Sequence, residues 1–236
     1  MYKIDLARAF RQLKVDPYDF PLLCLRWRDE FFCDTSVPFG HRSGGLGCIR
    51  LTSAIGYIHS LRGHHVMTYF DDMISGELPE NAERSFNHLH GLLRKLHMPI
   101  SVSKLAPPST RITCLGIEID STSQTLAISE QKLNEIVHKC SEVLKKKSIS
   151  VKHLQFVIGL LLFIHKAVKP ARIFVNRMLQ SLRNSQGMEF VNVDAEMLKD
   201  LRWFVKFVAK YNGCSKYVHT PIQSFQQVEL DASLGA

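Results

Sequence analysis

Short apolar runs dominate the first 128 residues, and residues that favour turns separate them. Runs of this kind, rich in Ile, Val, Phe and Tyr, predict strands. The predicted strands are at 2–6, 22–27, 31–35, 66–70, 73–75, 112–119 and 126–128. Apolar residues spaced three and four apart predict helices over 46–61 and 86–96, and the glycines of 38–47 predict a loop. We therefore expect this half to combine a sheet with helices.

The pattern becomes helical after about residue 129. Apolar residues recur at every third or fourth position from 133 to 144, and Ser129, Ser150 and Asp194 are suited to cap helix N-termini. Further helices are expected at 151–168, 171–182 and 195–210, with Pro170 ending the first of them. The change at 120–129 predicts a domain boundary. The longest apolar run, 157–164, is too short to span a bilayer, which needs roughly 20 residues.

The net charge of +8 is concentrated in the helical half. Residues 1–120 carry 14 Lys and Arg against 13 Asp and Glu, whereas residues 121–236 carry 16 against 9. A basic surface favours a polyanionic partner, so the second half is the better candidate for contact with a phosphate backbone. A solvated basic face is the alternative for each lysine. The candidate lysines are Lys139, Lys145, Lys146, Lys147 and Lys152.

The six cysteines are scattered and form no C-x-x-C pair, and no signal peptide precedes them. This usage predicts reduced thiols in an intracellular protein of the cytoplasm or nucleus, with no membrane partner. Cys24 and Cys33 face each other across the first predicted hairpin, where we expect a reduced pair rather than a bridge. The eleven histidines show no H-E-x-x-H motif, and neither His64–His65 nor the His88/His90 pair has the companion ligands of a zinc site.

Two adjacent acids, Asp71 and Asp72, lie at the tip of the second predicted hairpin. Like charges this close repel each other unless a cation lies between them. Asp5 ends another apolar strand, and if the two strands are neighbours, three carboxylates converge. Such an arrangement suits a pair of divalent ions in phosphoryl transfer. The alternatives are that Asp71 and Asp72 merely suit a turn and that Asp5 is a surface acid.

Four segments carry a more specific signal. They are KIDLARAFRQL at 3–13, VPFGHRSG at 37–44, YFDD at 69–72, and SK at 103–104 followed by CLGIEI at 114–119. In this order and spacing they resemble the catalytic motifs of retrotransposon and retroviral-type reverse transcriptases, and they cover about residues 2–120. The glycine-rich stretch 44–48 departs from the family pattern, in which a bulkier residue is expected.

The resemblance implies a polymerase active site. Asp5 and Asp71 match the metal ligands of the palm, and Asp72 matches the third acid, which binds metal less directly. The implied cofactor is Mg²⁺, with Mn²⁺ possible as a substitute. Lys104 matches a lysine that protonates the departing pyrophosphate, although a solvated surface lysine is an equal alternative.

The same resemblance assigns residues to the nucleotide and the primer. Phe10 matches the steric gate that excludes a ribose 2′-hydroxyl, and the backbone of Arg8 and Ala9 would lie near the triphosphate. Phe39 and Gly40 would touch the incoming nucleotide and the template base. Leu115 and Gly116 would begin the primer grip. The alternatives are that Phe10 is an ordinary core residue, that Phe39 and Gly40 belong to a plain connecting loop, and that Leu115 and Gly116 belong to a core strand.

The implied fold class is α+β: a polymerase palm with a ferredoxin-like antiparallel sheet and helices on one face, followed by a mostly helical thumb or connection. The predicted domains are a palm at 1–122, a thumb at 123–222 and the start of a ribonuclease H-like domain at 223–236. Asp231 matches the first metal-binding acid of that nuclease. The chain ends before the nuclease's other acids, so we expect no nuclease activity.

The expected activity is RNA-directed DNA polymerisation: two-metal nucleotidyl transfer from a deoxynucleoside triphosphate to a primer paired with an RNA or DNA template. The family's fingers, with cations that neutralise the triphosphate, would precede Asp5. Without them we expect this chain alone to be weak or inactive. The alternatives are an inactive retroelement remnant that only binds nucleic acid, and an interaction protein whose acidic turns arose by chance.

Overall fold

The computed structural model describes residues 1–217. The chain divides into two compact units, the first made of residues 1–122 and 127–136 and the second of residues 123–126 and those from 137 onward. The expected nuclease segment at 223–236, including Asp231, lies outside the described residues. Each unit is described by itself.

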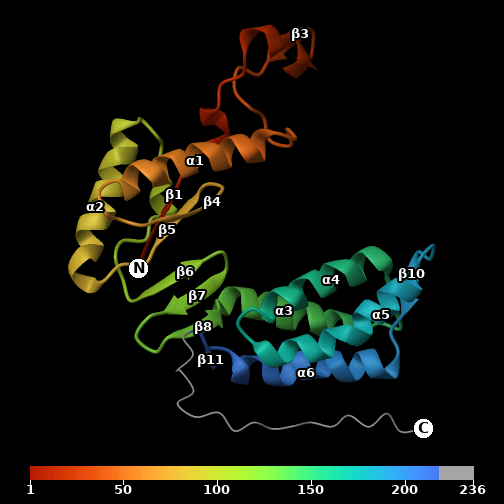
Figure 1. Ribbon diagram of the computed structural model, residues 1–236. Coiled ribbons are helices and arrows are strands. Elements are labelled where there is room, and N and C mark those ends of the chain that lie inside the picture. Colours follow the sequence, from red (N-terminus) through yellow and green to blue (C-terminus); the bar gives the residue numbers. More distant parts are fainter. Residues whose placement is uncertain (218–236) are drawn as a thin grey trace, which may run out of the picture. The chain divides into compact units, whose positions relative to one another are not determined.

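The centre of the first unit is a three-stranded antiparallel sheet (Figure 1). Its strands are β1 (Tyr2–Asp5), β5 (Asp72–Ser75) and β4 (Met67–Tyr69), with β5 in the middle. The register pairs Tyr2 with Ser75 and Asp5 with Asp72. Because side chains alternate along a strand, Tyr2 and Ile4 point to one face while Lys3 and Asp5 point to the other.

Two helices cover the face of Tyr2 and Ile4 (Figure 1). They are α1 (Gly44–Ser60) and α2 (Pro79–Lys95), and their buried residues Cys48, Ile55, Leu89 and Leu93 form one core with the strands. Burial of apolar side chains drives this packing, because each Å² of apolar surface removed from water stabilises the fold by about 25 cal/mol. The predicted loop over 38–47 is wrong at its end, because residues 44–47 are already helical. Gly47 lets this first turn of the helix lie close to Leu13, because a Cβ at position 47 would come within 2.8 Å of the Leu13 side chain.

The opposite face of the sheet carries a smaller core. Ile74 packs there against Ile112 and Cys114 of β6 (Arg111–Cys114), which forms a hairpin with β7 (Ile117–Asp120). A single strand over 112–119 was predicted, and this prediction is wrong. Leu115 and Gly116 both have positive φ, 48° and 78°, so the chain reverses direction at these two residues.

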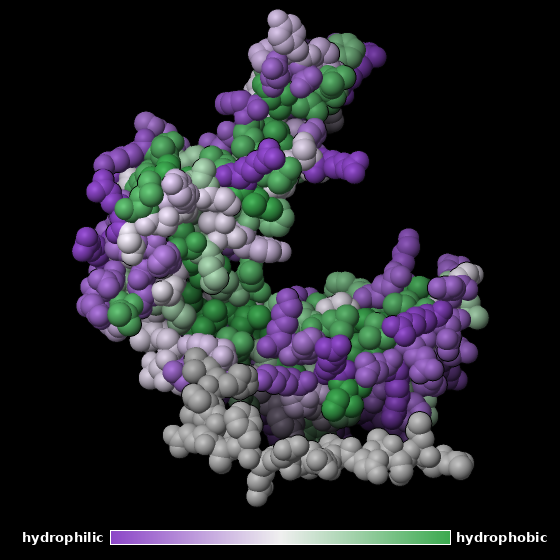
Figure 2. Space-filling view, viewed as in Figure 1, coloured by the Kyte–Doolittle hydropathy of each residue, from purple (hydrophilic) through white to green (hydrophobic). Residues whose placement is uncertain are grey.

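An arm follows β1 in the first unit. After the 3₁₀ helices η1 (Ala9–Gln12) and η2 (Pro17–Leu23), it consists of a hairpin of β2 (Cys24–Trp27) and β3 (Glu30–Cys33). Its apolar side chains are largely exposed, including Trp27 and Phe31, and Figure 2 shows hydrophobic residues gathered on it. The prediction that Cys24 and Cys33 are reduced is wrong, because the structure joins them by a disulfide. The register of the hairpin places the two residues directly opposite each other, which allows this bond. The other four cysteines are free thiols.

The second unit is mainly helical. Ser150 and Asp194 cap helices as predicted, since their side chains accept hydrogen bonds from the backbone N–H groups of His153 and Met197. The predicted helix over 171–182 is instead a 3₁₀ turn followed by a short helix. No helix within residues 1–217 has the length and apolar character needed to cross a membrane. The elements that follow β7 are β8 (Thr125–Ile128), α3 (Glu130–Val143), β9 (Ser148–Ser150), α4 (Val151–Ile164), η4 (Lys169–Val175), α5 (Asn176–Asn184), β10 (Phe190–Asn192), α6 (Ala195–Tyr211) and β11 (Ser215–Lys216), with β8 and α3 shared between the units.

Candidate active site

Three acids meet at one end of the central sheet. Asp5 is the last residue of β1, and it lies opposite Asp72, the first residue of β5. Asp71 occupies the turn before β5, and its carbonyl accepts a hydrogen bond of 2.9 Å from the backbone N–H of Leu6. Phe70 makes this tight turn possible by adopting a φ of 52°. The sheet therefore brings Asp5 next to two adjacent acids that follow it by 66 and 67 residues in the sequence.

Lys104 contacts the most buried of these acids. It ends the 3₁₀ helix η3 (Val102–Lys104), and its Nζ lies 3.0 Å from Oδ2 of Asp5. The backbone N–H of Ser101 also bonds to the carbonyl of Asp5 at 2.8 Å, which fixes this segment beside the strand end. The side chain of Lys104 is 59% exposed and that of Asp5 only 5%. The hydrogen bond and the charge of Asp5 raise the pKa of Lys104, so its ammonium form is favoured.

Lys3 forms an ion pair with Asp72, the second acid, and the sequence pattern did not single out this lysine. Its Nζ lies 3.1 Å from Oδ1 of Asp72, and both side chains are 13% exposed. That oxygen accepts no well-formed hydrogen bond from the described residues, so the contact is an ion pair without hydrogen-bond geometry. The strand alternation in YKID was a usable signal, because it places Lys3 on the same face as Asp5.

Burial dominates the electrostatics of Asp5. Desolvation raises its pKa most; Lys104 opposes this rise, and the neighbouring Asp72 and Asp71 add to it. Three carboxylates thus share two ammonium groups, which leaves an excess of negative charge. A cation at this point would be favoured, because it would offset both the burial of Asp5 and the repulsion among the acids.

The donor chemistry fits a hard divalent cation, which prefers carboxylate oxygens. Asp72 Oδ1, buried and without a hydrogen bond, and the poorly solvated Asp5 are consistent with this preference. Within residues 1–217, however, no three His, Cys, Asp or Glu side chains are arranged around a point where they could hold a metal ion. The positive charges beside Asp72 and Asp5 in this part of the chain are those of Lys3 and Lys104.

The candidate nucleotide residues lie along η1 and the loop that precedes α1. The rings of Phe10 and Phe39 are 5.5 Å apart, with Phe39 largely exposed. Phe10 also packs against the core under α1, so it is both a core residue and a neighbour of the loop. Arg8 has a φ of 54°, and Ala9 is buried. Gly40, with a φ of 88°, turns the loop beyond Phe39.

The candidate primer-grip residues are the turn of the β6–β7 hairpin. Leu115 is 46% exposed, so its side chain is available to a partner. The alternative of a core strand is wrong for these two residues, because they form a turn.

Comparisons with known proteins give a structural likeness only. No protein-family model matches the chain, and no curated protein matches its sequence. Three structures of foamy viral protease-reverse transcriptase match 90% of the chain. The form called dRH, in complex with double-stranded DNA, is 17% identical with a TM-score of 0.71, and the chain covers 35% of it. The complex with an RNA/DNA hybrid is 16% identical with a TM-score of 0.68 and 28% coverage; the other complex with double-stranded DNA is 15% identical with a TM-score of 0.70 and 42% coverage.

The fold prediction is confirmed by this likeness. The chain has a mixed α+β, reverse-transcriptase-like fold with antiparallel sheets. It spans less than half of the length of the matched structures.

Proposed function

We propose that the chain is part of an RNA-directed DNA polymerase of a retroelement and that the first unit is its palm. The observation that carries the proposal is the meeting of Asp5, Asp71 and Asp72 at the end of one antiparallel strand pair. This meeting occurs in a reverse-transcriptase-like fold, and the matched structures are complexes with DNA or an RNA/DNA hybrid. The proposed partners are a primed RNA or DNA template and deoxynucleoside triphosphates.

In the proposed reaction, Asp5 and Asp71 would hold magnesium, with manganese as a substitute. When bound, the metal would stabilise charge on the attacking and leaving oxygens of nucleotidyl transfer. Asp72, paired with Lys3, supports the site from the second strand. Lys104 would donate a proton from Nζ to the departing pyrophosphate, because a lysine side chain carries this proton at neutral pH. Its contact with Asp5 raises its pKa further, so this contact would have to weaken as the proton is transferred.

The remaining candidates bind the substrates. The backbone of Arg8 and Ala9 lies near the triphosphate, and Phe39 and Gly40 touch the nucleotide and the template base. Leu115 and Gly116 contact the primer. None of these contacts requires the second unit, whose basic residues add phosphate contacts along the duplex.

The test is primer extension by the whole chain on primed RNA and primed DNA. We expect weak incorporation that requires Mg²⁺ or Mn²⁺, stops when EDTA is added and adds only the nucleotide complementary to the template. Long incubations at high protein concentration suit a weak enzyme. Absence of extension with either metal on either template would favour the second candidate function, binding without catalysis, for this chain.

A second candidate function is nucleic-acid binding without catalysis. The charge of the helical half favours it, because residues 121–236 carry 16 Lys and Arg against 9 Asp and Glu. Under this alternative, extension is absent while a labelled primer–template still binds. Binding through phosphates would weaken steeply with salt, by about one power of the salt concentration for each phosphate contact.

Removal of the Phe10 ring is expected to weaken discrimination between sugars. Phe10→Val shortens the side chain that would clash with a 2′-hydroxyl, so the preference for deoxynucleotides should fall by about 10- to 100-fold. The measurement is the ratio of deoxynucleotide to ribonucleotide incorporation. Tyr18→Val, which truncates an exposed aromatic residue of the arm, is the control and should leave the ratio unchanged. An unchanged ratio in Phe10→Val would remove the gate role from Phe10.

A further inference from the structure

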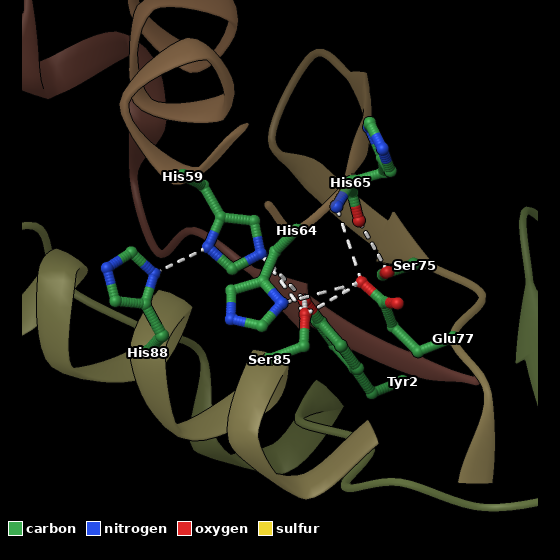
Figure 3. A network of polar contacts seen from close by, with 8 residues as sticks. All are labelled: Tyr2, His59, His64, His65, Ser75, Glu77, Ser85 and His88. Atoms are coloured by element: carbon green, nitrogen blue, oxygen red, sulfur yellow. Dashed lines mark hydrogen bonds and ion pairs between the residues drawn. The ribbon is translucent and has the colours of Figure 1, made fainter. Parts of the chain in front are cut away.

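A buried polar network lies at the end of the strand pair opposite the acids (Figure 3). Tyr2 and Ser75, which pair in register, contribute to it from β1 and β5. Helices α1 and α2 and the loops beside them supply the other members. The residues drawn are Tyr2, His59, His64, His65, Ser75, Glu77, Ser85 and His88. This network ties both covering helices to the strands that carry Asp5 and Asp72.

Three imidazole rings form the centre of the network. His59 is completely buried, and His64 is 6% exposed. The ring of His59 stacks on those of His64 and His88 at centroid distances of 5.1 and 5.0 Å, and the rings of His64 and His88 are 5.7 Å apart. The histidine pairs noted in the sequence gave no sign of this grouping, because His59 lies on a different helix from His88.

The hydrogen bonds of His59 constrain its protonation. Nδ1 of His59 lies 2.8 Å from Nδ1 of His88, and one of these nitrogens must keep its lone pair for a bond to exist. Nε2 of His59 lies 3.2 Å from the hydroxyl of Tyr2 and 3.3 Å from Oγ of Ser85. Ser85 in turn donates to the carboxylate of Glu77 at 3.1 Å. A proton on both Nδ1 atoms turns this contact between α1 and α2 into a repulsion.

The surroundings give little compensation for such a charge. The pKa of His59 is lowered to about 4, first by burial and then by the nearby His88 and His64, while Glu77 opposes this lowering. The pKa of His88 is also lowered, by burial first and then by His64. Glu77 opposes the lowering at His59, whereas the groups that act on His88 are His64 and the cations Arg62, Lys95 and Arg84. The titratable and charged groups facing the rings are Tyr2, Arg62, His64, His65, Glu77, Arg84 and Lys95.

Within the part of the chain that the structure describes, no three His, Cys, Asp or Glu side chains are placed to hold a metal ion.

We propose that the His59–His64–His88 network is an acid-sensitive contact, here called the histidine clasp. When the rings are neutral, its hydrogen bonds hold α1 and α2 to β1 and β5. When both Nδ1 atoms of the His59–His88 pair carry protons, the hydrogen bond between them is lost. Loss of this bond loosens the end of the strand pair that is anchored by Tyr2 and Ser75, so the sheet carrying the acids is destabilised below neutral pH. This inference concerns folding and does not depend on polymerase activity.

The sign of the effect follows from linkage. The folded pKa of His59 is about 4, below the ordinary value of 6.5. The unfolded chain therefore binds a proton first as the pH falls, and stability is lost from about pH 6.5 down to about pH 4. Between pH 7.5 and 5.0 His59 alone should shift the folding equilibrium roughly 30-fold toward the unfolded state.

The test is urea unfolding of the whole chain at pH 7.5 and 5.0, with His59→Gln compared to wild type. Gln keeps polar atoms that can replace both contacts of His59, but it does not titrate. Between pH 7.5 and 5.0 the folding equilibrium of His59→Gln should therefore shift roughly 30-fold less than that of the wild type. His138→Gln, at an exposed position of α3, is the matched control and should keep the wild-type shift. Equal acid shifts in His59→Gln and wild type would overturn the proposal.

A second measurement covers the case in which His59→Gln fails to fold. His88 is only partly buried, so His88→Gln should be tolerated, and it removes the Nδ1 partner of His59. In this variant the acid shift should shrink severalfold, and the His59 ring resonances observed by NMR should titrate at a higher pH than in wild type. If the His59 resonances of the wild type titrate near pH 6.5, no clasp exists.

Discussion

Primer extension by Asp71→Asn is expected to fall to the background level, because losing a metal-binding carboxylate removes roughly 4 kcal/mol of transition-state stabilisation, about 1,000-fold in rate. The amide is nearly the same size as the carboxylate, so the turn between β4 and β5 should survive. What is lost is the negative charge that, with Asp5, would hold a divalent cation. The assay is incorporation of a labelled nucleotide in Mn²⁺ and in Mg²⁺.

Two comparisons make this result specific. Glu83→Gln removes an exposed acid from α2, in the same unit but away from the three acids, and should extend primers as the wild type does. Binding of the primer–template should be unchanged in Asp71→Asn, because the substitution removes no cation. Equal incorporation by Asp71→Asn and wild type would remove Asp71 from the proposed catalytic site.

Lys3→Met is expected to destabilise the chain by about 3 kcal/mol at pH 7, the largest effect on stability that we predict. Met has a similar length but no charge, so Asp72 would remain largely buried without its ion partner. Leaving one buried charge unpaired costs far more than the pair itself contributes. The measurement is the free energy of unfolding in urea.

A double substitution isolates the pair. Lys3→Met combined with Asp72→Asn removes both charges, and it should recover most of the stability that Lys3→Met loses. The matched surface control is Lys199→Met, which breaks an exposed ion pair with Glu196 and should cost no more than about 1 kcal/mol. If Lys3→Met changes stability no more than this control does, then Lys3 does not hold Asp72.

Local pattern was sufficient to predict much of the first unit. The strand ending at Asp5 and the hairpin bearing Asp71 lie where periodicity placed them, because alternation and turn residues act over a few positions. The caps at Ser150 and Asp194 are local in the same sense. The reversal at Leu115 was missed because its positive φ is unusual for a leucine, so a continuous apolar run concealed a turn.

The sequence by itself determined the strand and helix pattern, the excess of basic residues in the second half and the presence of candidate acids in a recognisable order. Tertiary structure alone decided which charges and rings meet: Lys3 with Asp72, Lys104 with Asp5, and His59 with His88. The physical reason is that these contacts join residues on different elements, and their partners follow from strand register and helix packing. Neither can be read from spacing along the chain.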